Sequence, residues 1–259
     1  MTRLVRIELL KLRTTRLVYG LLATAAGLTA LFSVLEATRV GGDAPVSTTA
    51  GFGSVITGGI WSLLLAAVLG VITSSGEFRH STATATYLLT PRRDRVLSAK
   101  AIAGAGAGAV YGLAGWLIAT AVGLGFVLAH GDAVPLSAVA IARYAAGHVV
   151  AGALLAAIGV GLGSLIRSQL AGVIGVFIWA VVIESVLGSL YNSVQPYLPY
   201  TAATTLAGSA LGGAAFGPAH GAATSASPLP FAAAAALLAA IAVVIAVVAA
   251  RTTVRADIS

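Results

Sequence analysis

The amino-acid sequence predicts an all-α integral membrane protein that crosses the bilayer with six helices. Of its 259 residues, 58% are hydrophobic and only 9% are charged, which is too few charges to cover a soluble protein of this size. The mean hydropathy of +0.98 indicates the same class. Each helical span needs about 20 mostly apolar residues. Six stretches meet this requirement: residues 17–35, 52–73, 101–129, 144–166, 170–190 and 231–250. They use most of the chain, so we expect residues 1–259 to form a single transmembrane domain.

The chain starts with a basic segment, in which five of the first 16 residues are Lys or Arg, directly before the first apolar stretch. A secretory signal has a shorter apolar core of about 7–15 residues and a small-residue cleavage site, so we expect a retained helix instead. Residues 1–16 should form an amphipathic helix at the membrane interface, with Leu4, Ile7 and Leu12 facing lipid. Its polar residues are Arg3, Arg6, Glu8, Lys11, Arg13 and Arg16.

Basic residues set the expected orientation, because Lys and Arg collect in short cytoplasmic loops. With the N-terminus inside, all of the 15 basic residues except Arg39 and Arg143 are cytoplasmic, and so are both termini. The excess of Arg over Lys, with abundant Ala and Gly, indicates a GC-rich bacterial genome and therefore the bacterial cytoplasmic membrane. The basic residues are spread over the membrane flanks rather than gathered in one patch, which argues against nucleic-acid binding.

Several kinds of chemistry are excluded by the residues that the chain lacks. It has no cysteine, and its four histidines lie on separate segments without metal-ligand spacing. Neither Lys11 nor Lys100 follows the glycine-rich run of a phosphate-binding loop. We therefore expect no catalytic residues, no metal and no cofactor in this chain, and any ATP and Mg²⁺ would be bound by another subunit.

Residues 74–100 form the expected cytoplasmic connection between the second and third spans. The proline at position 91 disfavours a helix through the residue before it, so the segment should fold as a helix, a break and a second helix that runs into the third span. An ordinary basic loop held by anionic lipid headgroups is the alternative.

The order of residues in this segment has a further meaning. A glutamate follows the second span, then come a small-residue polar helix, a break, and a basic stretch that enters the third span. The residues that carry this order are Glu77, Thr82, Leu88, Leu89, Pro91, Arg95 and Lys100. With Glu8, Lys11 and Arg16 near the start and the run 197–200 after the fifth span, the chain resembles the permease subunits of type-2 ATP-binding-cassette transporters, which export drugs and polysaccharides.

The resemblance implies that the segment contains a coupling helix, which docks into a groove on a separate ATPase subunit. The candidate coupling residues are Glu77, Phe78, Arg79, Thr82, Leu88, Leu89, Pro91 and Arg95. The N-terminal helix would contact the same ATPase as well as membrane lipid. Six spans are half of what such exporters use, so a homodimer or a heterodimer with a second permease is expected. The few polar groups in the spans favour a hydrophobic or amphipathic substrate.

Small residues on the third span indicate close helix packing. Gly104, Gly108 and Gly112 recur at four-residue spacing, which places them on one face of the helix. Such faces let helix backbones approach closely in lipid. Packing within one bundle and packing at a dimer seam both fit this pattern.

Glu184 lies inside the fifth span, about two turns from its outer end. Intramembrane carboxylates face the bundle interior and are paired, so we expect Glu184 to pair with Arg143 or His148 on the antiparallel fourth span. A polar point in a translocation path and a proton-coupling acid are the other interpretations of this residue.

Residues 191–230 are expected outside, first as short helices at the outer interface and, from about residue 207, as a flexible linker or part of a cap. The resemblance implies that these short helices cap the outer mouth of the pathway. Two other functions stay open. An ion-coupled secondary transporter would use paired intramembrane ionisable residues and inverted repeats, of which only Glu184 is visible. A non-transporting scaffold or immunity subunit would have the same sequence pattern as a permease.

Overall fold

The computed structural model describes residues 1–39, 46–79, 93–208 and 227–253. Within these ranges the regular structure is entirely helical, without a strand. Six helical segments are long and apolar enough to cross a membrane, which confirms the predicted number and positions of the spans. They are Arg16–Thr38, Thr49–Gly76, Arg95–Ala129, Ala138–Ile166, Gln169–Leu190 and Phe231–Thr252.

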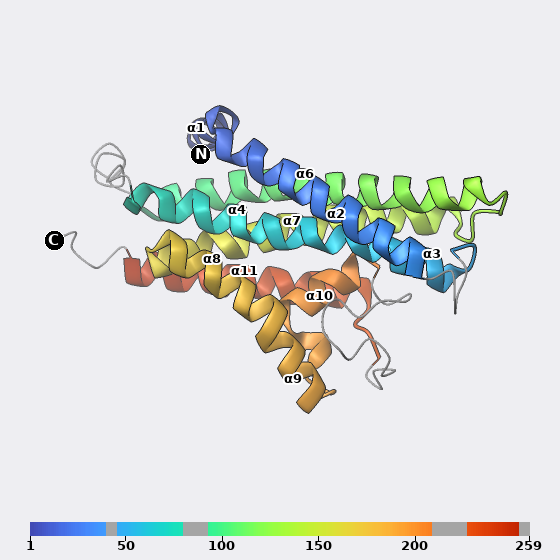
Figure 1. Cartoon of the computed structure of the whole chain (residues 1–259). Helices are drawn as coiled ribbons and strands as arrows, with labels where there is room; N and C mark the ends of the chain where they lie inside the picture. Colours follow the sequence, from blue (N-terminus) through green and yellow to red (C-terminus); the bar gives the residue numbers. More distant parts are fainter. Residues whose placement is uncertain (40–45, 80–92, 209–226, 254–259) are drawn as a thin grey trace.

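The helices form an elongated bundle, from which one segment diverges (Figure 1). In chain order they are α1 (Thr2–Thr14), α2 (Arg16–Arg39), α3 (Thr49–Ile56), the 3-10 helix η1 (Thr57–Gly59), α4 (Ile60–Arg79), α6 (Arg93–Ala129), α7 (Ala138–Ile166), α8 (Gln169–Phe177), the π-helix η2 (Ile178–Ile183), α9 (Glu184–Leu190), the 3-10 helix η3 (Gln195–Tyr197), α10 (Pro199–Leu206) and α11 (Phe231–Thr253). We refer to the end that holds α1, the last turn of α4 and the first turn of α6 as the basic end, and to the opposite end as the far end.

Local sequence explains where the helices begin and turn. Ser137 and Ser168 precede α7 and α8, and the hydroxyl of each accepts a hydrogen bond from a backbone N–H in the first turn. Arg167 adopts a left-handed conformation with a φ of 56°, which ends α7 and allows α8 to follow at once. The fourth and fifth spans are therefore joined by a tight turn.

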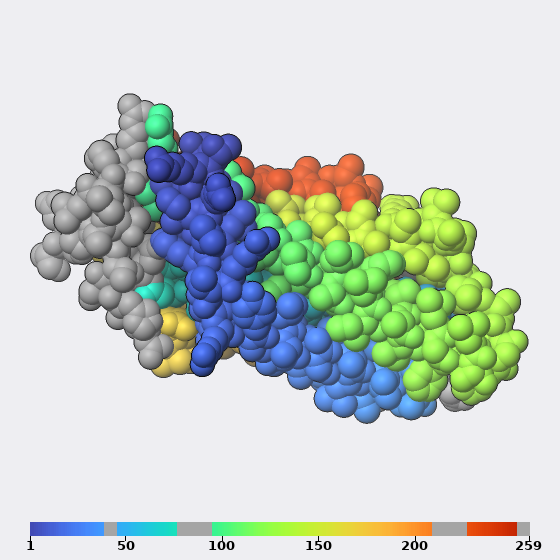
Figure 2. Space-filling view, turned by 90° about the horizontal axis from the view of Figure 1, so that it is seen from above, coloured from blue at the N-terminus to red at the C-terminus, as the bar shows by residue number. Residues whose placement is uncertain are grey.

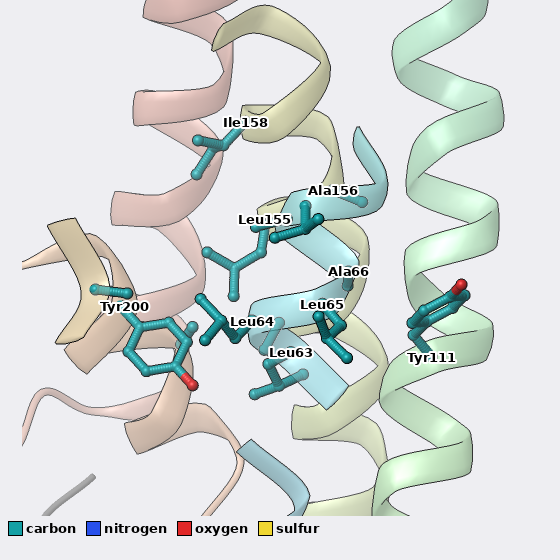
Figure 3. Close-up of a cluster of buried hydrophobic side chains, with 14 of the residues drawn as sticks. Leu63, Leu64, Leu65, Ala66, Tyr111, Leu155, Ala156, Ile158 and Tyr200 are labelled. Atoms are coloured by element: carbon teal, nitrogen blue, oxygen red, sulfur yellow. The ribbon is translucent and has the colours of Figure 1, made fainter. Parts of the chain in front are cut away.

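The second span lies at the centre of the bundle. Its most apolar window is 83% buried, against 17% for the first and last spans, because other helices surround it and lipid does not. Leu63, Leu64 and Ala66 of α4 pack against Leu155 and Ala156 of α7 in the main core (Figure 3). The hydroxyl of Tyr111 on α6 donates to the carbonyl oxygen of Val18 on α2 at 2.6 Å and so joins the first span to this core.

Glycines allow α6 and α7 to pack backbone against backbone. A Cβ added at Gly108 would overlap with the carbonyl oxygen of Gly152, and one added at Gly112 would overlap with that of His148. At Gly104 the Cβ would lie 2.8 Å from a methyl carbon of Val160. The predicted small-residue face of the third span is thus used for packing within one bundle, not at a dimer seam.

We expect the substitution Gly108→Ala to lower the stability of the folded protein by about 1–3 kcal/mol, because the added methyl group forces two backbones apart. Gly106→Ala is the matched control on the same helix, since a Cβ there meets no atom within 4 Å. It should be neutral or stabilising, because Ala favours a helix over Gly by up to about 1 kcal/mol. Thermal unfolding in detergent checks both, and equal effects of the two substitutions would contradict this packing.

Candidate functional site

The predicted coupling segment joins two helices at the basic end. Glu77, Phe78 and Arg79 form the last turn of α4, with their side chains outside the described part of the structure. Thr82, Leu88, Leu89 and Pro91 also lie outside the described residues. Arg95 lies in the first turn of α6 and is exposed. The described structure therefore places the two ends of the segment on the second and third spans.

The N-terminal helix α1 is anchored to this region by a buried carboxylate. Glu8 is only 9% exposed, and it is the buried residue of α1. Its Oε1 lies 2.7 Å from Nζ of Lys11, and its Oε2 lies 3.5 Å from Nζ of Lys100 on α6. The helix thus turns Glu8 toward α6 and leaves Arg3 and Arg6 exposed.

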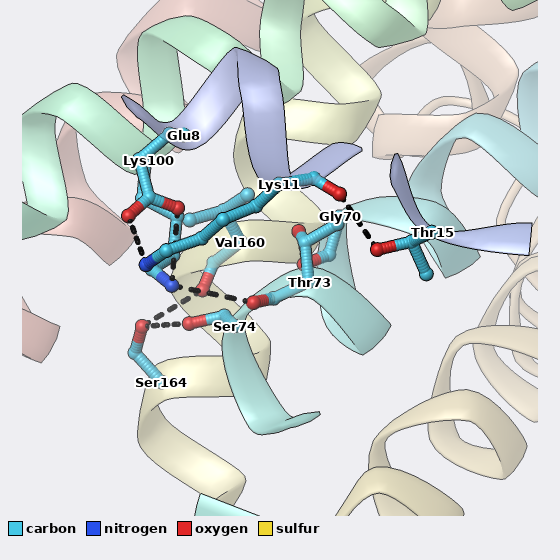
Figure 4. Close-up of polar contacts among 9 residues, drawn as sticks. All are labelled: Glu8, Lys11, Thr15, Gly70, Thr73, Ser74, Lys100, Val160 and Ser164. Atoms are coloured by element: carbon cyan, nitrogen blue, oxygen red, sulfur yellow. Dashed lines mark hydrogen bonds and ion pairs between the residues drawn. The ribbon is translucent and has the colours of Figure 1, made fainter. Parts of the chain in front are cut away.

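Lys100 connects three helices at one point. It is 5% exposed, and besides its ion pair with Glu8 it donates to the carbonyl oxygen of Thr73 on α4 at 3.3 Å. Directly beside it, the hydroxyls of Ser74 and Ser164 lie 2.5 Å apart and join α4 to α7. Figure 4 shows these contacts as one group. We call this group the basal cluster; its members are Glu8, Lys11, Thr73, Ser74, Lys100 and Ser164.

The remaining side chains of α1 suit a membrane surface. Arg3, Arg6 and Arg13 are exposed, as is Arg16 at the start of α2. Ile7, which was expected to face lipid, is 45% exposed, whereas Leu4 and Leu12 are half-buried on the same side as Glu8. Exposed apolar and basic groups on one helix favour contact with lipid headgroups and the acyl boundary. Figure 2 shows α1 on the surface of the molecule next to α6.

Glu184 does not pair with Arg143 or His148, so that prediction is wrong. Its Oε1 accepts hydrogen bonds from Trp179 Nε1 at 2.9 Å and from the backbone N–H of Tyr200 at 2.7 Å. Its Oε2 accepts from the backbone N–H and the hydroxyl of Thr201, at 2.8 and 2.9 Å. The carboxylate therefore caps the N-terminus of α10.

The sequence of α10 explains why it needs this partner. The helix begins with Pro199, which has no N–H, and its N-cap residue Leu198 has no side chain that can accept a hydrogen bond. The N–H groups of Tyr200 and Thr201 are left for an acceptor from elsewhere. A carboxylate there also interacts favourably with the positive end of the helix dipole.

A local change in helix type brings the carboxylate into position. Residues Ile178–Ile183 form a π-helix, which closes hydrogen bonds over five residues instead of four. Trp179 and Glu184 are five residues apart, so the wider turn places both side chains on one face, where they hydrogen-bond. In a regular α-helix this spacing would separate them by more than a third of a turn.

Arg143 and His148 have other neighbours. The Arg143 guanidinium carbon lies 5.8 Å from the ring centroid of Phe231, a cation–π contact between α7 and α11. His148 is fully buried, and its Nδ1 donates to the carbonyl oxygen of Tyr144 at 2.9 Å. Its Nε2 faces Gly59, where an added Cβ would lie 2.6 Å away.

The short helix α10, which lies in the stretch expected to form short interfacial helices, packs closely against the other helices. Tyr200, Ala203 and Leu206 are at most 4% exposed. A Cβ at Gly147 of α7 would overlap with the carbonyl oxygen of Leu206, so α10 lies directly against the fourth span. One local signal in the sequence could have indicated that this helix needs an acceptor from elsewhere: Leu198 and Pro199 give its start no cap of its own.

Similarity to known proteins adds no constraint on these interpretations. The chain matches no protein-family model, and no curated protein matches it significantly. Within the described residues, no group of three or more His, Asp or Glu could hold a metal ion. A functional proposal therefore depends on the basal cluster, on the Glu184 contacts and on the sequence pattern.

We expect Lys100→Met to release α1 from the bundle, because Glu8 would lose its partner on α6 and would be left buried. A cysteine placed at the half-buried Val5, in a chain that has no cysteine of its own, reports this by its rate of reaction with a maleimide. The rate should rise at least about fivefold, the factor expected when one hydrogen bond is lost.

The control for this experiment is Lys11→Met, which removes the exposed partner of the same carboxylate but leaves Lys100 in place. It should change the rate far less. Equal rates in the wild type and in Lys100→Met would show that Lys100 does not hold α1.

Proposed function

We propose that this chain is the transmembrane subunit of an ATP-binding-cassette exporter, driven by a separate ATPase subunit. The observation that carries the proposal is the pairing of Glu8 with Lys100, which fastens α1 to α6 at the base of the predicted coupling segment. Lys100 also reaches Thr73 of α4, so the helices on both sides of the segment and the N-terminal helix share one polar anchor.

This anchor suits the transmission of force. A docked ATPase would push or pull on the segment between Arg79 and Arg93, and both flanking helices continue into the membrane. The helix α6 runs unbroken over 37 residues, from Arg93 to Ala129, so a displacement at its base reaches the far end. Because α1 is tied to the same base, it would move with the segment and could contact the same ATPase.

The expected composition of the complex follows from this role. The basic end would face the cytoplasm of a bacterial cell, and ATP and Mg²⁺ would bind to the partner subunit. A second permease, identical or different, would complete the pathway. The core is made mostly of Leu, Val and Ala, which favours a hydrophobic or amphipathic substrate.

A secondary transporter that carries protons on Glu184 has less support. Three of the four contacts to this carboxylate come from N–H groups, which can only donate, and the fourth comes from the Thr201 hydroxyl. The contacts therefore favour a carboxylate that accepts hydrogen bonds and positions α10.

The decisive experiment is purification of the tagged chain from its native membrane in mild detergent, followed by mass spectrometry of the proteins that remain bound. We expect a stoichiometric P-loop ATPase, and we expect the double substitution of Glu77 and Phe78 by Ala to abolish its binding. Arg251→Ala is the control, because this exposed basic residue belongs to the last turn of α11 and lies outside the predicted coupling segment in the sequence.

Two results would contradict the proposal. One is a folded, monodisperse chain that retains no ATPase in any mild detergent, which would favour a scaffold or a secondary transporter. The other is an ATPase that binds equally well to the wild type and to the double variant, which would place the contact elsewhere.

A further inference from the structure

The second span contains a break that other helices support. The 3-10 turn Thr57–Gly59 interrupts it between α3 and α4, where two consecutive glycines weaken the α-helix. Mid-helix 3-10 turns often mark hinges. On one side of the break, the Ser33 hydroxyl of α2 donates to the carbonyl oxygen of Val55 at 3.0 Å. On the other side, the hydroxyl of Tyr200 donates to the carbonyl oxygen of Ile60 at 2.8 Å.

Tyr200 therefore has polar contacts in two directions. Its side chain ends on Ile60 of the second span, while its backbone N–H donates to Glu184 of the fifth span. Tyr200 is 4% exposed, and Figure 3 shows its ring pointing toward the leucines of α4. One buried residue of α10 thus links the two spans through two hydrogen bonds.

The outer part of the fifth span depends on this link. Residues 178–190 lead away from the bundle, as Figure 1 shows for α9. Large apolar side chains along them, including Ile178, Val182 and Val186, are 46–52% exposed. Glu184 is 4% exposed and turns the other way, toward α10. Glu184 therefore holds this diverging segment to α10 by polar contacts.

We propose that α10 is a strut between the second and fifth spans, fixed to Ile60 by Tyr200 and to Glu184 by the N–H groups of its first turn. When α4 moves at its hinge, the strut carries the motion to α9 and so sets the position of the far end of the fifth span. Glu184, Tyr200 and Thr201 are positioning residues in this device. The connection to ATP rests on the proposed function, whereas the link between the two spans does not.

The strut is stiff because detachment at either end exposes polar groups to an apolar surrounding. At the Glu184 end, two backbone N–H groups and a carboxylate would lose their partners together. At the Ile60 end, only one neutral hydrogen bond would be lost. Detachment at the Glu184 end should therefore cost more free energy than detachment at the Ile60 end, and separate substitutions at the two ends can test this difference.

The first arm of the test uses the chain alone in lipid nanodiscs. Because the sequence has no cysteine, spin labels can be attached at Ser189→Cys on α9 and Val139→Cys on α7, both exposed positions. Pulsed electron–electron distance measurements should give one narrow distribution in the wild-type background. Thr201→Val and Glu184→Ala should add a second distance population, which corresponds to molecules in which α10 is detached at one end. Tyr200→Phe should raise the fraction of such detached molecules about fivefold, the factor for one lost hydrogen bond.

Trp116→Phe is the matched control for a loss of a buried polar group. The indole N–H of Trp116 is buried and has no hydrogen-bond partner among the described residues, so its removal breaks no contact. Trp179→Phe removes the equivalent group from a Trp that does hydrogen-bond to Glu184, and it should broaden the distribution. Should Glu184→Ala fail to fold, Thr201→Val, Trp179→Phe and Tyr200→Phe still decide the question, and identical narrow distributions in all of them would overturn the strut.

The second arm adds the ATPase subunit and compares nucleotide-free with ATP-bound complexes. We expect the distance between the labels to shift with ATP in the wild type and in Trp116→Phe. We expect a smaller fraction of molecules to show this shift in Tyr200→Phe and Thr201→Val, although both still bind the ATPase. A merely structural role would leave the shift intact in every variant that folds, and that result would overturn the strut. If no ATPase binds the chain, the proposed function fails while the first arm still decides the strut.

Discussion

Backbone polar groups inside an apolar bundle must find partners within the protein, since lipid offers none. This constraint governs the places where the helices are irregular. At the start of α10, the N–H groups of Tyr200 and Thr201 have no acceptor in their own helix, and the carboxylate of Glu184 supplies it. At the 3-10 turn of the second span, hydroxyls of Ser33 and Tyr200 meet the carbonyl oxygens on both sides. The irregular segments are therefore the points at which separate spans are joined.

Between these points, the bundle is held by close packing of small residues. Gly108 and Gly112 of α6 lie against the backbone of α7, and this contact leaves no room for a side chain. Charges appear in the described core mainly at the basic end, where Lys100 is surrounded by Glu8 and the carbonyl oxygen of Thr73. The molecule thus has a rigid glycine-packed centre, an ionic anchor at one end and a hydrogen-bonded strut toward the other. Such a division suits a protein that transmits force from a loop at one end to a helix at the other.

Hydropathy predicted all six spans because length and apolarity alone decide whether a helix can cross a bilayer. The contacts of Glu184 could not be predicted in the same way. They require a π-helical turn, which has no clear sequence signature, and a short helix that folds inward from a stretch whose prolines and tyrosines resemble an outer surface. The partner of Glu8 could not be predicted either, because Lys100 was assigned to the cytoplasmic connection between the second and third spans on grounds of charge. The sequence pattern shows which residues are costly to bury, but only the three-dimensional structure shows which groups form contacts with them.

Amide hydrogen exchange over residues 199–206, compared between the wild type and Glu184→Ala in the same nanodiscs, tests the central claim most directly. If the carboxylate holds the first turn of α10, the amides of Tyr200 and Thr201 should exchange slowly in the wild type. In the variant they should exchange faster by at least about tenfold, because hydrogen bonds to a charged group are lost there. Protected segments on α6 and α7 should remain unchanged. Equal exchange at residues 199–206 in both proteins would contradict the account.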